Sequence, residues 1–103
     1  MPKIVKWTPK ADESFDEVID YLRNNWTQNE VSSFAKMTLN LIKSISEFPK
    51  MFKEDKENNI RTANINNVVN LIYREKENQI ELLYFWNNKQ NPSKLIKLIN
   101  KNP

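Results

Sequence analysis

The sequence predicts a single α+β domain in which an αα-hairpin packs on one face of a mainly antiparallel β-meander. Two observations lead to this fold class. Apolar residues recur at helical spacing from residue 9 to residue 48, whereas residues 60–86 form short apolar runs separated by turn residues. A meander has one face to bury, and two helices with apolar stripes are sufficient to cover it. At 103 residues, we expect residues 1–103 to form one domain.

A short strand and a helix are expected at the amino terminus. Residues 3–7 are rich in strand-forming side chains. Thr8-Pro9 then signals a helix start, because proline fits the first helical position, where its missing N–H is no loss. The apolar stripe of this helix is formed by Ala11, Phe15, Val18, Ile19, Leu22 and Trp26, and its other face is acidic.

A second helix is expected to begin almost at once. Thr27 and Glu30 have the spacing of a capping box, in which each side chain satisfies a backbone N–H of the other residue. Pro49 stops the helix. The apolar seam is formed by Val31, Phe34, Thr38, Leu41, Ile45 and Phe48. Because almost no linker separates the two helices, an antiparallel αα-hairpin is expected.

The second half of the chain is expected to be extended. Residues 50–59 are charged and turn-forming, which is typical of a loop. Asn66-Asn67 predicts a tight turn, because asparagine tolerates positive φ. The expected strands are residues 60–65, 68–74 and 79–86, and Ser93 is expected to cap a short C-terminal helix with Leu95, Ile96, Leu98 and Ile99.

Missing residue types exclude several classes of function. The chain has no cysteine, no histidine and no glycine. Disulfides, thiolate nucleophiles, histidine bases and the commonest metal ligands are therefore excluded, and glycine-rich phosphate loops cannot form. We expect no metal and no cofactor. The chain has no apolar run long enough to span a bilayer and no signal peptide, so we expect a cytoplasmic protein with no membrane partner.

Basic residues concentrate in the second half of the chain. Residues 1–47 carry six Lys or Arg against seven Asp or Glu, whereas residues 48–103 carry ten against six. After Glu81 there are four lysines and no acid: Lys89, Lys94, Lys97 and Lys101. This pattern favours a surface for an acidic partner, and the alternative is a solvated basic tail.

The chain resembles a known family from Val5 to Leu95. Four segments carry the resemblance: KWTPKADESFDEVIDYL, SISEFP, NIRTANINNVVNLIY and IELLYFWNNKQNPSKL. In the last segment, Lys89-Gln90-Asn91-Pro92 is similar to an arginine-Gln-Asn-Pro pattern of that family. The family is the RelE/ParE superfamily of type II toxin–antitoxin toxins, also called plasmid stabilisation proteins.

The resemblance implies a small toxin that is neutralised by a cognate antitoxin. RelE-like members are endoribonucleases that cleave mRNA on the ribosome, and ParE-like members poison DNA gyrase without being hydrolases. A third alternative is an inactive remnant that only binds an antitoxin, or a basic nucleic-acid-binding module. Whether the chain is an enzyme therefore stays open at this point.

The chemistry of RNA cleavage favours the ParE-like branch. Attack by a 2′-hydroxyl needs a base, a cation near the phosphate and an acid. Arg61 matches the position of a family arginine, but no Tyr or His follows Tyr84. The long helical pair also resembles ParE-like members. We therefore expect contact with gyrase, with the ribosome and mRNA as the alternative.

Arg61 and Lys89 are the candidate catalytic residues if the protein is a ribonuclease. Arg61, Arg74, Lys89 and Lys94 are the candidates for binding a target or partner. We expect Arg61 and Lys89 to lie at the open side of the sheet, within reach of a carboxylate or phosphate. The alternative for Arg61 and Arg74 is an ordinary position on a strand. The three tryptophans, Trp7, Trp26 and Trp86, are expected to pack in or around the core.

Overall fold

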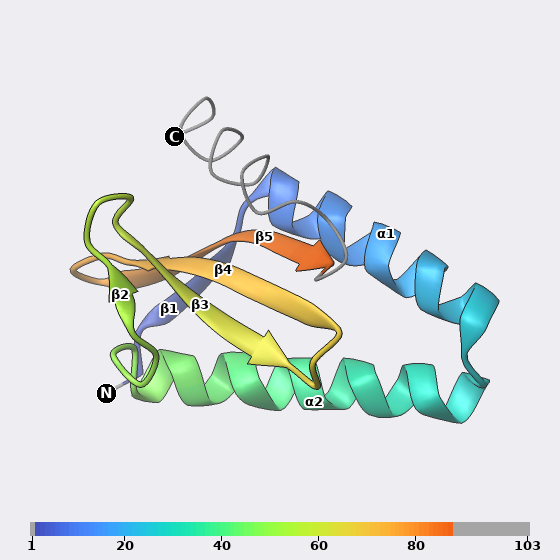
Figure 1. Cartoon of the computed structure of the whole chain (residues 1–103). Coiled ribbons are helices and arrows are strands. Elements are labelled where there is room, and N and C mark those ends of the chain that lie inside the picture. Colours follow the sequence, from blue (N-terminus) through green and yellow to red (C-terminus); the bar gives the residue numbers. More distant parts are fainter. Residues whose placement is uncertain (1, 88–103) are drawn as a thin grey trace.

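A computed structural model describes residues 2–87 of the chain as two helices on a five-stranded sheet (Figure 1). The expected C-terminal helix from Ser93 lies outside these residues. In chain order the elements are β1 (Ile4–Trp7), α1 (Pro9–Asn25), α2 (Gln28–Glu47), β2 (Glu54–Asp55), β3 (Ile60–Ile65), β4 (Val69–Glu75) and β5 (Gln79–Asn87). The predicted α+β class is confirmed.

The sheet has the strand order β1-β5-β4-β3-β2. Strands β3, β4 and β5 form the expected antiparallel meander. The first strand pairs in parallel with the last, with Val5 opposite Ile80 and Trp7 opposite Leu82. This parallel pairing places β1 at one edge of the sheet and α1 beside β5.

Both predicted helix starts are present. The Thr8 hydroxyl accepts a hydrogen bond of 3.2 Å from the Ala11 N–H, and Pro9 is the first residue of α1. Thr27 and Glu30 form the reciprocal capping box at the start of α2. The helices diverge from their short connection and lie on the same side of the sheet (Figure 1).

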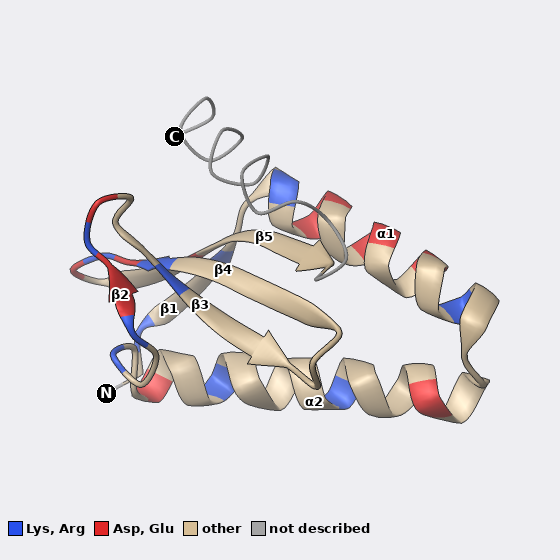
Figure 2. Cartoon of the chain, in the orientation of Figure 1, with Lys and Arg blue, Asp and Glu red and all other residues tan. Residues whose placement is uncertain are grey.

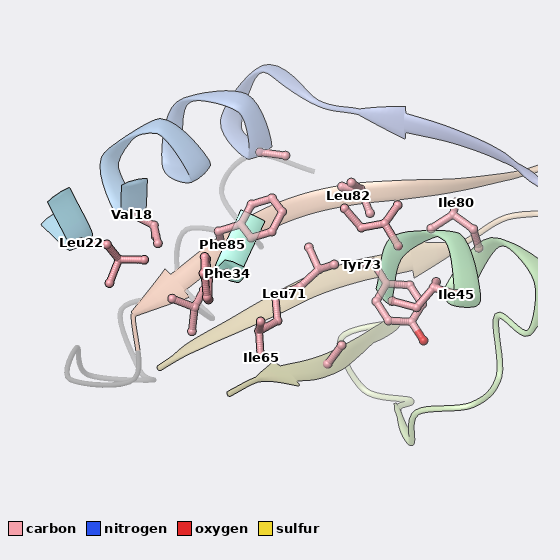
Figure 3. Packing of buried hydrophobic residues seen from close by; sticks show 14 residues of the cluster. Val18, Leu22, Phe34, Ile45, Ile65, Leu71, Tyr73, Ile80, Leu82 and Phe85 are labelled. Carbon is pink, nitrogen blue, oxygen red and sulfur yellow. The ribbon is translucent and has the colours of Figure 1, made fainter. Parts of the chain in front are cut away.

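The main core lies between the two helices and the sheet (Figure 3). Each helix contributes one side of its apolar stripe, and β3 and β4 contribute alternate residues. A ring cluster joins the first strand to this core, because Trp7 stacks on Phe85 at 5.4 Å and meets Phe15 edge-on at 5.6 Å. The largest fully buried side chains include Leu22, Phe34, Ile45, Leu71, Tyr73 and Leu82.

The loop expected at residues 50–59 contains a short strand. Strand β2 pairs with the start of β3, with Glu54 opposite Arg61. The turn that follows is held by the carboxylate of Asp55, whose pKa is lowered by hydrogen bonds from the Asn58 side chain, the Asn58 N–H and the Glu57 N–H. A two-residue strand leaves no alternating pattern, so sequence reasoning missed it.

The expected turn between β3 and β4 is present. Asn66 and Asn67 have φ values of 52° and 59°, so both central residues lie in the left-handed region that two-residue hairpins favour. The carboxamide oxygen of Asn64 also accepts a hydrogen bond of 3.0 Å from the Asn67 N–H. The turn fixes the register of the β3–β4 pair.

A bulge in β5 explains why its sequence is apolar without alternation. Ile72 lies opposite Tyr84 and Tyr73 lies opposite Leu82, so Leu83 has no partner on β4. The extra residue reverses the alternation of the strand. Leu82 and Phe85 therefore both join the main core, while Trp86 joins a second buried cluster with Ile60 and Ile72.

Candidate functional site

Arg61 is held inside the fold by two contacts. Its Nη1 donates a hydrogen bond of 2.6 Å to the Phe52 carbonyl, and its Nη2 lies 3.8 Å from a carboxylate oxygen of Glu75. Arg61 lies opposite Tyr73, and directly opposed residues share a sheet face, so Arg61 lies on the face that the helices cover. The side chain is 12% exposed. The expectation that Arg61 lies at the open side of the sheet is wrong, because the strand register assigns it to the other face.

The carboxylate of Glu75 forms ion pairs with two basic side chains, those of Arg61 and Lys3. The Nζ of Lys3 lies 3.1 Å from the Glu75 carboxylate and donates a hydrogen bond to the Lys76 carbonyl. Together with Arg61, these groups join the start of the chain to one end of the sheet. Their polar contacts are typical of a structural network, in which each charge has a partner.

Tyr73 is the buried hydroxyl beside this network. Its hydroxyl donates a hydrogen bond of 2.9 Å to the Pro49 carbonyl. Burial raises the pKa of Tyr73 to about 12; the Arg61 charge lowers it and the Glu75 charge raises it further. The phenol therefore stays protonated at neutral pH and is engaged in a structural bond.

Arg74 fastens the turn that precedes β3. Its Nε donates to the Asn59 carbonyl at 2.9 Å, and its Nη2 donates to the Asn58 carbonyl at 3.3 Å. Asn59 has a φ of 54°, so the arginine supports a left-handed residue. Arg74 and Arg61 are thus not brought together. Lys89 and Lys94 lie outside the described residues, and the roles of all four in binding stay predictions.

Acidic residues recur along the exposed side of α1, and Figure 2 colours their positions on the helix red. Two of them, Glu13 and Glu17, lie close enough to Tyr84 on β5 to act on its hydroxyl. Burial raises the pKa of Tyr84, and the two carboxylates raise it further. The acidic strip of α1 therefore lies near Tyr84 of β5. Its exposed members are Asp12, Glu13, Asp16, Glu17 and Asp20.

Two hollows flank Trp26, at the connection between the helices. One has a volume of about 270 Å³ and lies against Phe34, Met37 and Asn66. The other has a volume of about 290 Å³ and lies against Leu22 and Val68. Trp26 contributes to both hollows and meets Phe34 edge-on at 6.0 Å. Sequence reasoning treated Trp26 as packing only, because the β3–β4 turn that completes the hollows is distant in sequence.

Arg61 and Tyr73 face the same side of the sheet, and their polar groups are engaged in contacts within the fold. The Arg61 guanidinium donates to the Phe52 carbonyl, and the Tyr73 hydroxyl donates to the Pro49 carbonyl. Among residues 2–87, no group of three or more acidic, His or Cys side chains is placed to hold a metal ion. The helices described here are too short or too polar to cross a membrane.

Comparison with known proteins agrees with this fold. A chain from the chromosomal ParDE toxin–antitoxin system of Pseudomonas aeruginosa is similar in structure, with a TM-score of 0.69 and 16% identity over 82% of this chain and 95% of that chain. A copper-bound mutant toxin from Helicobacter pylori matches with a TM-score of 0.54 and 16% identity, over 84% of this chain and 96% of that one. No curated protein sequence matches.

The family is established by the sequence itself. A family model described as ParE toxin of type II toxin-antitoxin system, parDE, matches residues 5–92. This range includes every helix and strand described above except the first residue of β1. The chain therefore belongs to the ParE toxin family of type II toxin–antitoxin systems, within the RelE/ParE superfamily.

Proposed function

We propose that this protein is a cytoplasmic toxin that poisons DNA gyrase by protein contact and is neutralised by a cognate antitoxin. The observation that carries the proposal is the match of the ParE toxin family to residues 5–92. The similar structure from Pseudomonas aeruginosa also comes from a ParDE system, which pairs a toxin with an antitoxin.

The contacts of Arg61 and Tyr73 within the fold favour action by protein–protein contact over RNA cleavage. The chain has no histidine, so proton transfer would rest on Lys, Arg, Tyr or a carboxylate. Tyr73 has a raised pKa and a main-chain partner, and Arg61 is paired with Glu75. Using either group on RNA would require breaking contacts that hold the sheet to the segment after α2.

The hollows beside Trp26 are suitable places for the antitoxin. Apolar side chains of a partly disordered antitoxin segment would enter them, with the asparagine amides around the rim as hydrogen-bond partners. Such a segment would become ordered on contact. Calorimetric titration with the antitoxin should then give a large negative heat-capacity change. Absence of binding at micromolar concentration would contradict the proposed neutralisation by an antitoxin.

Induction of the toxin in growing cells tests the target. A gyrase poison should cause a DNA-damage response and altered plasmid supercoiling before protein synthesis falls. Purified toxin should also inhibit supercoiling by gyrase, and the antitoxin should restore it. Prompt translation arrest with mRNA cut inside codons would instead identify a RelE-like ribonuclease. Binding to the antitoxin without any growth arrest would identify an inactive remnant.

A further inference from the structure

Helix α2 runs along one border of the molecule and exposes large apolar side chains on one flank (Figure 1). Met37 is 43% exposed, and Phe48 at the C-cap is 65% exposed. At about 100° per residue, Ser33 and Ser44 lie on the same flank as these two side chains. The whole flank, which we call the side stripe, consists of Glu30, Ser33, Met37, Leu41, Ser44 and Phe48.

The two ends of the side stripe have opposite shapes. The hollow of about 270 Å³ beside Trp26 lies at Ser33, between Glu30 and Met37. At the other end, the Phe48 side chain projects into solvent. An exposed aromatic ring and an apolar hollow are the two halves of the anchor-and-pocket contacts that dominate protein interfaces. The stripe therefore carries both halves of such a contact, about fifteen residues apart.

The turn that follows Phe48 is held in place from inside the fold. The Met51 N–H donates a hydrogen bond of 3.1 Å to the Phe48 carbonyl, and the buried Tyr73 hydroxyl donates one of 2.9 Å to the Pro49 carbonyl. Met51 is nevertheless 49% exposed. A turn that is already fixed loses little conformational entropy on binding, so it is suited to present apolar side chains to a partner.

A two-fold axis through the middle of α2 would match each projecting end with a hollow. When two copies of α2 lie antiparallel with the axis between residues 40 and 41, Phe48 lies opposite Ser33 and Met37 lies opposite Ser44. Each large side chain then faces a small one, as ridges-into-grooves packing requires. Such a contact is isologous, because the same surface of both copies supplies both sides, and it closes at two chains.

The charges at the two ends of the stripe favour the same arrangement. Glu30 is exposed beside the hollow, and Lys50 is exposed in the turn between Phe48 and Met51. Antiparallel helices bring Lys50 of one copy toward Glu30 of the other, whereas parallel helices would bring like charges together. Complementary charges at an interface fix its orientation and register.

We propose that the side stripe is an interface between two copies of this chain, in which Phe48 of each copy fills the hollow at Ser33 of the other. The pairing does not depend on gyrase as the target. The antitoxin is assigned to the same hollow above, so a second copy and the antitoxin compete for it; this consequence rests on the proposed function. The free toxin is then a dimer that neutralisation separates.

Sedimentation of the full-length chain over a concentration series tests the interface. We expect a species of twice the 12.3 kDa chain mass. Phe48→Asp should raise the dissociation constant by about 100-fold, because the anchor becomes a carboxylate in an apolar hollow. Leu39→Asp is the matched control, since Leu39 is 57% exposed on the opposite flank of α2. A parent that is monomeric at about 0.5 mM, or equal effects of the two variants, would overturn the proposal.

Cysteine cross-linking tests the antiparallel register. The chain has no cysteine, so Met37→Cys and Ser44→Cys can be made as single-cysteine variants and mixed. We expect a disulfide between the two variants in the mixture, in higher yield than in either variant alone. Lys36→Cys mixed with Lys43→Cys is the control, because both positions are exposed outside the side stripe. An equal yield from the control mixture would contradict the register.

Titration of the same variants with the antitoxin separates this interface from the proposed function. Phe48→Asp removes the projecting ring and keeps the hollow, so it should lose the dimer and retain antitoxin binding. Ser33→Trp fills the hollow from an exposed position and should weaken both. A dimer that persists in Ser33→Trp would overturn the proposal. If the dimer behaves as expected but no variant binds the antitoxin, the pairing stands and the proposed neutralisation fails.

Discussion

The hydroxyl of Ser14 on α1 accepts a hydrogen bond of 2.9 Å from the backbone N–H of Phe85 on β5, 71 residues later in the chain. At this point β5 is paired with β4 on one side only, because β1 on its other side ends at Trp7, opposite Leu82. Thr8 hydrogen-bonds to the same edge of β5 three residues earlier, because its hydroxyl and its N–H both donate to the Leu82 carbonyl. Two side chains of the first helix thus complete the edge of the sheet where β1 stops.

Ser14→Ala should lower the free energy of unfolding by about 1–3 kcal/mol, because it leaves the buried Phe85 N–H without an acceptor. Chemical denaturation measures the loss. Ser32→Ala on the exposed side of α2 is the control for the change in helix propensity and should be neutral or slightly stabilising. Equal stability of the two variants would mean that water replaces the hydroxyl.

Asn67→Ala should destabilise the β3–β4 hairpin by about 1–2 kcal/mol, because a Cβ without a polar group disfavours the φ of 59°. Asn67→Gly should be tolerated, since glycine adopts positive φ without strain and the N–H bond to Asn64 is retained. Thermal unfolding of both variants checks the difference. A neutral Asn67→Ala would show that the turn changes type.

Arg61→Ala should lower stability, in contrast to the unchanged melting temperature expected for a surface residue. The substitution removes the bond to the Phe52 carbonyl and one partner of Glu75, at a cost of about 1–3 kcal/mol. Lys56→Ala, an exposed change on the nearby turn, should have little effect. Growth arrest should be compared at equal levels of folded protein, so that loss of stability is separated from loss of a binding contact.

Tyr73→Phe should change how stability depends on pH. The folded pKa of about 12 lies above the ordinary value of 10.0, so the stability linked to the protonated phenol is complete below pH 10 and is lost as the pH rises toward 12. The parent should therefore be more stable than Tyr73→Phe at pH 8, and the gap should narrow between pH 10 and 12. Denaturant melts across this range measure the gap; a constant gap would argue against a buried phenol.

Lys89→Ala should reduce growth arrest while the melting temperature changes little. The physical reason is the loss of a cation that is expected to meet a target or antitoxin carboxylate, at a position resembling the family's arginine-Gln-Asn-Pro pattern. Lys89→Arg should restore activity. If the alanine variant is as toxic as the parent at equal protein level, Lys89 is a solvated side chain.

The sequence alone was sufficient for features that depend on neighbouring residues. The capping residues Thr8 and Thr27, the stop at Pro49 and the turn at Asn66 and Asn67 were all predicted from local chemistry, and the structure contains them. The two helical stripes and the three long strands follow from periodicity. These features together predicted the α+β class, which the structure confirms. The resemblance to the RelE/ParE superfamily rested on four sequence segments, and the family match over residues 5–92 confirms it.

Tertiary structure decided which partners meet across long separations. The parallel pairing of β1 with β5, the short strand β2, and the bulge at Leu83 leave no periodic signal, because each depends on a strand that is remote in sequence. The register of β3 against β4 turned Arg61 toward Phe52 and Glu75, although its sequence position suggested an open site. A one-residue difference in register reverses the face of every side chain, so local sequence determined the elements and only their packing determined which charges are free.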